Sequence, residues 1–342
     1  MPFDLFGGCV NTGLVLGKFL PLHNGHLYLI RFAAQHVQRL YVVVESVKNE
    51  PILHQTRLSW VRSLCPNCEV ISLVEHMPQR PEDSPDFWTQ WRTVLEGILP
   101  EQIDFVFASE RYGNPLASVL NAQFCPLDIG RIGENISGTQ IRDDIYAHWS
   151  HLPHPVQCHF QSKICIVGAE SVGKSTIAKS LAVHLNGRMV PEYARHYLET
   201  FERAPKLSDM PKVAFGQLCA ESARSEFGDP FLICDTDPLT TLVWSHHLFG
   251  RCDDQLRHWA SSVQYDLTLL LEPDVPWVAD SVRYTPNDRW AFHRRLVDTL
   301  NQYKRPYEII NGDWSERLIK AKQRVHQLMD AKRLSLFWTE ED

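Results

Sequence analysis

Two segments of the chain combine residue types that bind phosphate groups. Residues 17–26 read GKFLPLHNGH, in which Gly25 lies between His23 and His26 and Lys18 supplies a positive charge. Residues 168–175 read GAESVGKS, a complete G-x-x-x-x-G-K-S loop. The first segment is typical of nucleotidyl transfer and the second of phosphoryl transfer. Their order and separation predict two catalytic domains that act on one metabolite.

The first segment is expected where a strand gives way to a helix. Residues 13–17 form a short apolar run, and residues 25–37 have the spacing of an amphipathic helix. Ligands of open α/β sheets bind beyond the carboxyl ends of the strands, so this turn is well placed for a nucleotide. Imidazoles at a helix N-terminus can donate hydrogen bonds to phosphate oxygens that gain charge during transfer, and Gly25 permits close approach. The alternative is a surface histidine pair without function.

The segment ISGTQIR, residues 136–142, favours the functional interpretation. The hydroxyl groups of Ser137 and Thr139 can cap a helix and bind phosphate at the helix N-terminus. Arg142 adds a forked cation that matches phosphate geometry. The two segments would therefore meet at one phosphate site.

The second loop follows an apolar strand, residues 163–167, and precedes a predicted helix, residues 174–186. This context is the one expected for a phosphate-binding loop. Backbone amides of the loop would hold the β-phosphate, Lys174 would reach the β- and γ-oxygens, and Ser175 would bind Mg²⁺. The predicted ATP-binding residues are Gly168, Glu170, Ser171, Val172, Gly173, Lys174, Ser175 and Thr176.

Residues 231–237, with the sequence FLICDTD, predict a strand that delivers two acids beside this loop. One of Asp235 and Asp237 could hold Mg²⁺ and the other could orient or deprotonate a substrate hydroxyl. The predicted magnesium ligands are Ser175 and Asp235. For Asp237 the alternative is a helix N-cap before Pro238.

Two arginines further along the chain predict a catalytic lid. Arg283 and Arg289 lie between a predicted strand, residues 267–271, and a predicted helix. A lid that carries arginines would close over the γ-phosphate and exclude water. The alternative is a solvated charged loop.

Length and composition limit the classes of protein. The 342 residues are enough for two domains with separate cores, and the net charge of -7 argues against a nucleic-acid surface. No run of about 18 apolar residues occurs, so no membrane span is expected. The N-terminus lacks a basic region of the secretory type, and the nine cysteines are scattered. We therefore expect reduced thiols and a cytoplasmic protein.

Residues 147–162 are rich in histidine and proline and predict an irregular linker rather than a metal site. Cys65 and Cys68 form a C-x-x-C pair without a second pair at zinc-site spacing, which indicates two ordinary thiols. We place the first domain at residues 1–150, the linker at 151–162 and the second domain at 163–342.

Apolar strands alternate with amphipathic helices on both sides of this linker. Continuous apolar strands indicate buried parallel sheets, so the fold class is α/β with two doubly wound parallel-sheet domains. The expected strands are residues 13–17, 39–44, 69–73, 103–108, 163–167, 231–234, 267–271 and 307–310. The expected helices are residues 25–37, 55–64, 86–99, 174–186 and 315–329.

Six segments, taken in order, resemble the NadR-type bifunctional family of NAD salvage. They read GKFLPLHNGH, ISGTQIR, GAESVGKST, PEYARHYL, CDTDPLTT and PWVADSVR. The resemblance implies an N-terminal Rossmann-like nicotinamide-mononucleotide (NMN) adenylyltransferase domain and a C-terminal P-loop ribosylnicotinamide kinase domain. It also implies ATP as co-substrate and Mg²⁺ as cofactor. Regulatory members carry an N-terminal helix-turn-helix domain, for which the dozen residues before the first strand are too few.

The resemblance also implies roles for single residues. His23, His26 and Arg142 would position ATP and stabilise charge in the first domain, without a covalent intermediate. Trp88 would stack on the cationic pyridinium ring of NMN, unless Trp88 and Trp91 are simply helix core. The implied ATP site of this domain is Gly17, Lys18, Phe19, Gly25, Ser137 and Thr139, and the implied riboside site of the kinase is Glu192, Tyr193 and Arg195.

These expectations describe a two-step enzyme. The C-terminal domain would phosphorylate nicotinamide riboside at its 5′-hydroxyl, and the N-terminal domain would adenylylate the resulting NMN to NAD. Two alternatives remain open: a fusion of the coenzyme A type with other substrates, and a nucleotide-sensing regulator with little turnover. The expected partners are small molecules (nicotinamide riboside, NMN, ATP and NAD), with no nucleic acid and no membrane. A homo-oligomer is left open.

Overall fold

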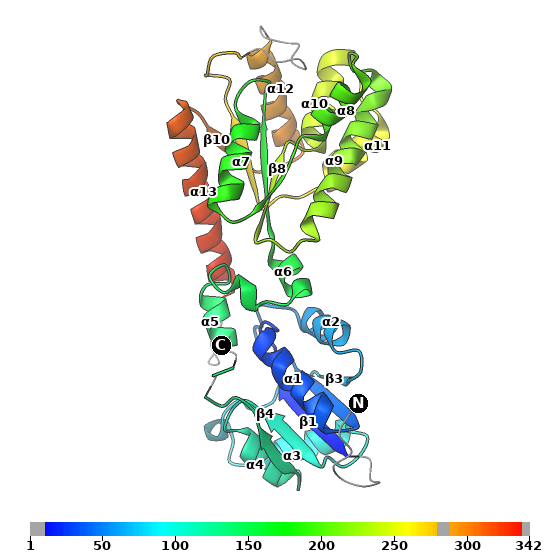
Figure 1. Cartoon of the computed structure of the whole chain (residues 1–342), viewed down its shortest axis with the longest axis vertical. Coiled ribbons are helices and arrows are strands. Elements are labelled where there is room, and N and C mark those ends of the chain that lie inside the picture. The colour runs from blue at the N-terminus through cyan, green and yellow to red at the C-terminus, as the bar shows by residue number, and fades with distance from the viewer. Residues whose placement is uncertain (1–10, 131, 134, 279–287, 337–342) are drawn as a thin grey trace. The chain divides into compact units, whose positions relative to one another are not determined.

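A computed structural model of the chain describes residues 11–130, 132–133, 135–278 and 288–336. These residues divide into two compact units, with the division between Val156 and Gln157 and with the described residues from Lys332 on grouped with the first unit. Each unit contains one five-stranded sheet flanked by helices (Figure 1). In the described part of the chain, no helix is long and apolar enough to span a bilayer.

The segment predicted as an irregular linker contains regular structure. Residues Trp149–His151 form the 3-10 helix η2, His154–Phe160 form α6, and β6 begins at Ser162. The prediction of an irregular segment was therefore wrong. Pro153 precedes the first residue of α6 and Pro155 lies in its first turn, where a missing N–H costs no helical hydrogen bond.

The first sheet has the strand order β3-β2-β1-β4-β5, with all neighbours parallel. The chain winds outward from β1 to β3 and then returns to the other side of β1, so the switch point lies between β1 and β4. The strands are β1 (Thr12–Gly17), β2 (Arg39–Glu45), β3 (Glu69–Leu73), β4 (Phe105–Ala108) and β5 (Gln123–Pro126). The helices are α1 (Asn24–His36), α2 (His54–Leu64), η1 (Pro81–Asp83), α3 (Phe87–Ile98), α4 (Gly113–Val119) and α5 (Gly138–Asp143).

The second sheet has the order β10-β9-β6-β8-β7 and is also parallel throughout. Its central strand, β6, leads into the glycine loop. The strands are β6 (Ser162–Gly168), β7 (Arg188–Val190), β8 (Phe231–Asp235), β9 (Leu267–Leu271) and β10 (Glu308–Ile310). The helices are α7 (Lys174–His184), α8 (Tyr193–Phe201), η3 (Leu207–Asp209), α9 (Met210–Ser225), α10 (Pro238–Phe249), α11 (Asp254–Ser262), α12 (Arg289–Gln302) and α13 (Trp314–Ser335).

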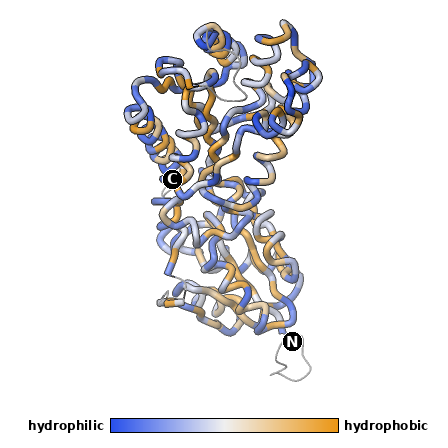
Figure 2. The backbone as a smooth tube through the Cα atoms, turned by 45° about the horizontal axis from the view of Figure 1, so that its top comes forward, coloured by the Kyte–Doolittle hydropathy of each residue, from blue (hydrophilic) through white to orange (hydrophobic). Residues whose placement is uncertain are grey.

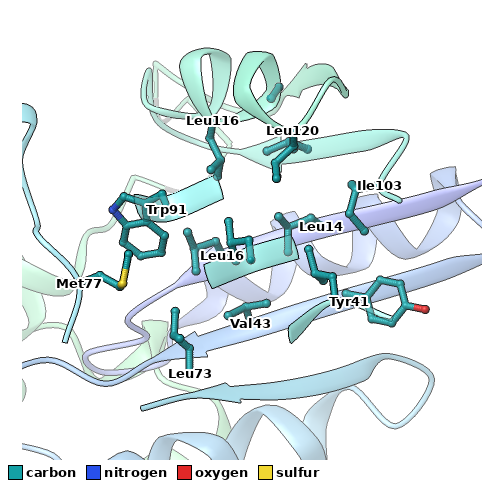
Figure 3. Packing of buried hydrophobic residues seen from close by; sticks show 14 of the residues in the cluster. Leu14, Leu16, Tyr41, Val43, Leu73, Met77, Trp91, Ile103, Leu116 and Leu120 are labelled. Carbon is teal, nitrogen blue, oxygen red and sulfur yellow. The ribbon is translucent and has the colours of Figure 1, made fainter. Parts of the chain in front are cut away.

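Both cores consist of the apolar strands that the sequence predicts, covered by helices. All five residues of β8 are buried, and six of the seven residues of β2 are buried. Hydrophobic residues concentrate along the central strands (Figure 2). In the first unit, Leu14, Tyr41, Trp91 and Leu116 belong to one cluster of buried residues from the sheet, α3 and α4 (Figure 3). The prediction of two doubly wound parallel-sheet domains is confirmed.

Strands β5 and β7 were not predicted. Each lies at an edge of its sheet, and they contain only four and three residues. Their sequences, QFCP and RMV, carry too few consecutive apolar residues to form a recognisable buried strand. These segments form strands because β5 pairs with β4 and β7 pairs with β8.

One carboxyl group lies in the core of the second unit. Glu221 of α9 is 3% exposed and accepts a hydrogen bond from Tyr265 Oη at 2.8 Å. Burial raises the pKa of Glu221 to about 7, against an opposing effect of the Tyr265 hydrogen bond. The nearby Asp237 raises it further, and Lys163 lowers it.

The Glu221 carboxyl predicts a pH-dependent stability. Its folded pKa lies above the unfolded value, so its contribution to stability is full below about pH 4.5 and is lost as the pH rises through about 7. We expect the free energy of unfolding of the wild type, relative to Glu221→Gln, to fall on the order of 3 kcal/mol between pH 4.5 and pH 8. Urea unfolding at several pH values measures this difference. Glu308→Gln, a change in a surface ion pair with Arg324, is the control. A difference that does not vary with pH would contradict the prediction.

Candidate functional site

A cavity of about 460 Å³ lies at the carboxyl ends of β1, β2 and β4 in the first unit. Gly17 ends β1, Glu45 ends β2, and Ser109 follows β4. Every residue that the sequence assigns to the adenylyltransferase site lines this cavity. These residues are Gly17, Lys18, Phe19, His23, Gly25, His26, Trp88, Ser137, Thr139 and Arg142.

The two histidines form a stacked pair at the N-terminus of α1. His23 is the N-cap residue, and its backbone N–H donates to His26 Nδ1 at 3.3 Å. The two imidazole rings stack with 3.7 Å between centroids. A Cβ atom on Gly25 would lie 3.1 Å from the His23 ring, so a larger residue there would push against the pair. Because Nδ1 accepts a bond, neutral His26 carries its proton on Nε2, the nitrogen that can donate to a phosphate oxygen.

Arg142 joins the two predicted motifs of this unit. Its Nη1 donates to the backbone carbonyl of Leu20 at 2.5 Å, and its Nη2 donates to Thr139 Oγ1 at 3.2 Å. Ser137 caps α5 and accepts from the backbone N–H of Gln140 at 3.2 Å. A Cβ atom on Gly138 would lie 2.8 Å from the Leu20 oxygen, so glycine permits this close approach.

A fully buried arginine supports the first turn, the segment between β1 and α1. Arg57 of α2 donates to the backbone carbonyls of Lys18 and Glu45, the latter at 2.8 Å. It also donates to the carbonyl of Ile52 at 3.1 Å and pairs with Glu50. These bonds fix the turn that carries Lys18 against the end of β2. The sequence analysis did not identify Arg57, because nothing in its local pattern distinguishes it from a surface arginine of an amphipathic helix.

The aromatic residues of α3 take two different positions. Trp91 is buried in the core cluster, and its Nε1 donates to the carbonyl of Pro78 at 3.1 Å. Trp88 is half-buried, packs edge-on against Phe87 at 4.8 Å and lines the cavity. Both tryptophans line the cavity and contact the core cluster, but Trp91 is buried in the cluster whereas Trp88 is only partly buried against it.

Other residues that line this cavity were missed at the sequence level, among them Glu45, Gln79 and Tyr112. Glu45 is 4% exposed, and Gln79 donates to its carboxylate. Tyr112 Oη donates to the carbonyl of Leu16 at 2.8 Å, and burial raises the pKa of this phenol. The one available signal was an acid directly after the predicted apolar strand of residues 39–44, which would have indicated Glu45.

A second cavity, of about 150 Å³, surrounds the glycine loop of the other unit. The predicted residues that line it are Glu170, Ser171, Val172, Gly173, Lys174, Ser175, Thr176, Glu192 and Arg195. Thr236, Thr241 and Trp244 also line it and were not predicted. Trp244 lies within α10, where the sequence pattern does not distinguish a cavity-lining position from a core position.

The loop has the backbone conformation that its glycines permit. Gly173 has φ +88°, and a Cβ atom there would collide with the ring of Trp314. Lys174 Nζ donates to the carbonyl of Ala169 at 2.9 Å, so the lysine folds back along the loop. The backbone N–H of Val278 donates to Ser171 Oγ at 2.7 Å.

A second fully buried arginine supports this loop as Arg57 supports the first turn. Arg317 of α13 donates to the carbonyl of Val172 at 2.9 Å and to the carbonyl of Glu272, beyond β9, at 2.8 Å. It also donates to the carbonyl of Gly312 at 2.8 Å and pairs with Asp274. The phosphate loop is thereby fixed to the segments that follow β9 and β10.

Asp235 has the environment of a functional acid. It is 1% exposed, and its Oδ1 has no hydrogen-bond partner among the described residues. Burial raises its pKa to about 6; the neighbouring Glu192 raises it further, and Lys174 and a bond from Ser175 lower it. Mg²⁺ prefers oxygen ligands and is usually bound by one or two protein groups together with phosphates and water. The Ser175 hydroxyl and the Asp235 carboxylate fit such an ion.

Asp237 lies in a helix cap, the alternative that the sequence analysis left open beside a role as a catalytic acid. It caps α10, where it accepts from the backbone N–H of Thr240 at 2.8 Å and from Thr240 Oγ1 at 2.7 Å. Its carboxylate pairs with Arg305 at 3.6 Å, and it is not among the described residues that line the cavity. The helix-cap alternative therefore describes this residue.

Two other predicted residues, Tyr193 and Arg289, are not among the described residues that line the cavity. Tyr193 packs against Gly216 of α9, where a Cβ atom would collide with its ring, and it is not among the described cavity residues. Arg289 begins α12 and donates to the carbonyl of Val275 at 2.9 Å, which ties it to backbone rather than to the cavity. Arg283 lies outside the described residues. The predicted lid role of Arg289 therefore has no support from its contacts.

The buried arginine of the second unit yields a prediction. Arg317→Lys should weaken binding of a non-hydrolysable ATP analogue at the glycine loop at least about tenfold. A lysine cannot donate to all the carbonyls that the guanidinium binds, and a buried acceptor left without a hydrogen bond destabilises the loop. Binding at the first cavity should not change. Calorimetric titration measures both sites, and Arg188→Lys, in an ion pair with Asp229 away from the lining residues, is the control. Equal losses in the two variants would assign the effect to general destabilisation.

Comparisons with known proteins agree with this geometry. A family model described as an AAA domain matches residues 163–317. The chain is 28% identical to the trifunctional NAD biosynthesis/regulator protein NadR of Salmonella typhimurium, over 93% of this chain and 83% of that protein. It is also 28% identical to the Escherichia coli protein of the same name, over 94% and 84%.

Two crystal structures of NadR share the fold over almost the whole chain. One holds NAD and AMP-PNP and the other holds NR; each has 22% sequence identity and a TM-score of 0.69. Each comparison covers 94% of this chain, together with 97% and 96% of the solved chains. With nearly the full length of the chain matched, this protein is similar in sequence to the two NadR proteins and has the fold of the solved NadR structures.

Proposed function

We propose that this protein is a two-site enzyme of NAD salvage. The second unit transfers the γ-phosphoryl group of ATP to the 5′-hydroxyl of nicotinamide riboside, which gives NMN and ADP. The first unit joins NMN to the adenylyl group of ATP, which gives NAD and pyrophosphate. The observation that carries the proposal is that each unit gathers its own phosphate-binding segment and partner residues around its own cavity.

In the first cavity the chemistry depends on position and charge. A phosphate oxygen of NMN forms a bond to the α-phosphorus of ATP while the bond to the bridging oxygen of pyrophosphate breaks. The N-terminus of α1, Lys18 and the Nε2–H of His26 stabilise the charge that develops on the α-phosphate and the leaving group. Arg142 holds the two loops together through Leu20 and adds its own positive charge.

In the second cavity the loop and Lys174 hold the phosphates of ATP. Mg²⁺, when bound by Ser175 and Asp235, would neutralise charge on the phosphates. Asp237 is committed to capping α10, so the acid that can orient the riboside hydroxyl is Glu192, which lines the cavity beside Arg195. Among the described lining residues Trp244 is the one aromatic side chain; it packs against Phe292 at 4.1 Å and is our candidate for the pyridinium ring.

The two alternatives have less support. A fusion of the coenzyme A type would bind a pantetheine arm, whereas the relatives compared above are named for NAD biosynthesis and one solved NadR structure holds NR. A regulator without turnover would not require the bonds around Lys174 and the stacked histidines. Products formed from ATP with nicotinamide riboside or phosphopantetheine would separate all three possibilities.

A substitution in one site should impair the reaction of that site alone. Lys174→Ala should abolish phosphorylation of the riboside and spare adenylylation of supplied NMN, because it removes the cation at the γ-phosphate. His26→Ala should lower the kcat of adenylylation by roughly 10²-fold or more and let NMN accumulate from the riboside. Chromatography of riboside, mononucleotide and dinucleotide follows both reactions. A folded Lys174→Ala protein that makes no NAD from NMN would disprove the two-site model.

Substitution of one tryptophan of α3 should affect substrate binding, and substitution of the other should affect stability. Trp88→Ala should raise the KM for NMN about tenfold and leave the KM for ATP unchanged, since one stacked aromatic face is lost. Trp91→Ala should instead lower the free energy of unfolding by roughly 3–5 kcal/mol, as for other buried aromatic residues. Steady-state kinetics and urea unfolding test both variants. Parallel changes of both KM values in Trp88→Ala would assign Trp88 to the core.

A further inference from the structure

One helix in the wall of the second cavity has little hydrophobic anchoring. Helix α8 carries Arg195 and Leu198, and Glu192 precedes it as the N-cap residue; all three line the cavity. Within the described range Tyr193–Phe201, none of the nine residues is buried. Helices in proteins are stabilised mainly by burying one face against their neighbours. The position of α8 must therefore depend on specific contacts with the elements beside it.

Helix α9 supplies two of these contacts, both to the first residue of α8. Gln217 is 1% exposed, and its Oε1 accepts a hydrogen bond from the backbone N–H of Tyr193 at 2.9 Å. The Tyr193 ring lies over Gly216, where a Cβ atom would come within 2.1 Å of the ring. Two adjacent residues of α9 therefore hold both the backbone and the ring of Tyr193.

The far half of α8 is held separately. Tyr197 Oη donates to Asp209 Oδ1 at 3.0 Å, and Arg203 donates to both oxygens of this acid at 2.6 and 3.0 Å. Asp209 is 1% exposed, and the bonds from Arg203 keep its pKa well below the usual range, so it stays ionised. Loss of the Gln217 bond would therefore release the first turn of α8 and leave the rest of the helix attached.

The first turn is the part of α8 that bears on the reaction. Glu192 directly precedes Tyr193, and its side chain makes no capping bond to the helix. Burial raises the pKa of Asp235 and the nearby Glu192 raises it further, which indicates that the two acids lie close together. Because a planar peptide bond joins Glu192 to Tyr193, a shift of one displaces the other. Gln217 is not among the described residues that line the cavity, so its effect there is indirect.

We propose that Gln217 is a positioning residue of the phosphoryl transfer: through the backbone of Tyr193, it places Glu192 against the riboside. The inference rests on the proposed phosphorylation of nicotinamide riboside in this unit. Tyr193 is then the link between α9 and the cavity, and not a ligand of the riboside. The glycine loop, which would hold the ATP phosphates, is fixed separately by Arg317 of α13. Loss of the Gln217 bond should therefore affect the riboside and not ATP.

The test uses the full chain and compares two substitutions of the same residue. Gln217→Met has a similar length and only a weakly accepting sulfur for the Tyr193 N–H. It should raise the KM for nicotinamide riboside about tenfold, lower kcat roughly threefold or more and leave the KM for ATP within about twofold. Gln217→Glu keeps an oxygen acceptor in either protonation state, so both constants for the riboside should stay within about threefold of the wild type.

Stability should order the two variants differently. Gln217→Glu places a second acid one turn from Glu221, which is itself buried, and a buried ionisable group without a partner destabilises the fold. Gln217→Met fills the same space with an apolar side chain. We expect Gln217→Glu to have the lower thermal midpoint and Gln217→Met to have the higher KM for the riboside. A loss of activity caused by instability would follow the opposite order.

Two further variants test the second contact and the specificity of the first. Gly216→Ala favours the α9 helix by propensity, yet its methyl group would displace the Tyr193 ring, so the KM for the riboside should rise roughly fivefold or more. Gln161→Met is the matched control, because Gln161 is also buried and donates to the carbonyl of Asp229 at 2.8 Å but is not among the described cavity residues. It should leave both KM values unchanged. Adenylylation of supplied NMN by the first unit is measured in every variant and should not change.

The outcomes distinguish this inference from the proposed function. A wild type that does not phosphorylate nicotinamide riboside overturns the proposed function and the inference with it. A wild type that does so, with an unchanged riboside KM in Gln217→Met, overturns the inference alone. So does an equal rise in Gln217→Met and Gln217→Glu, or a matching rise in Gln161→Met. A rise in the KM for the riboside that is confined to Gln217→Met and Gly216→Ala supports it.

Discussion

In each unit, one fully buried arginine fixes the turn that binds phosphate. Arg57 holds the carbonyl of Lys18 and Arg317 holds the carbonyl of Val172, and each also bonds to the segment at the end of a neighbouring strand. A buried guanidinium is tolerated only when its donors are satisfied, so neither turn can shift without leaving a charge unpaired. The donors for phosphate are thereby oriented before any nucleotide arrives, as electrostatic stabilisation requires.

The topology of the two sheets determines which residues lie beside these turns. Both are parallel with a switch in strand order, which brings loops far apart in sequence to the same carboxyl edge. The bond from Arg142 to Leu20 spans more than a hundred residues of sequence. Residues at neighbouring strand ends also line the cavities: Glu45, which ends β2, in one, and Thr236, which follows β8, in the other.

Acids close together in the sequence have different uses in the fold. Asp235 lies beside Ser175 and Glu192, and its Oδ1 has no hydrogen-bond partner among the described residues. Asp237 instead accepts hydrogen bonds from Thr240 and pairs with Arg305. Their local sequence is compatible with either role. Only the start of α10 directly after Asp237 assigns it to the cap.

The sequence by itself determined the fold class, the central strands and both phosphate-binding segments. These depend on local apolar runs and on glycines whose conformation no other residue supplies, as at Gly173. Tertiary structure decided the short edge strands, the helix after Pro153 and the burial of Arg57. It also decided that Trp91 is buried in the core cluster while Trp88 is only partly buried beside it. Such features depend on neighbours distant in the chain, and the packing of one helix face against a sheet is not encoded in its own periodicity.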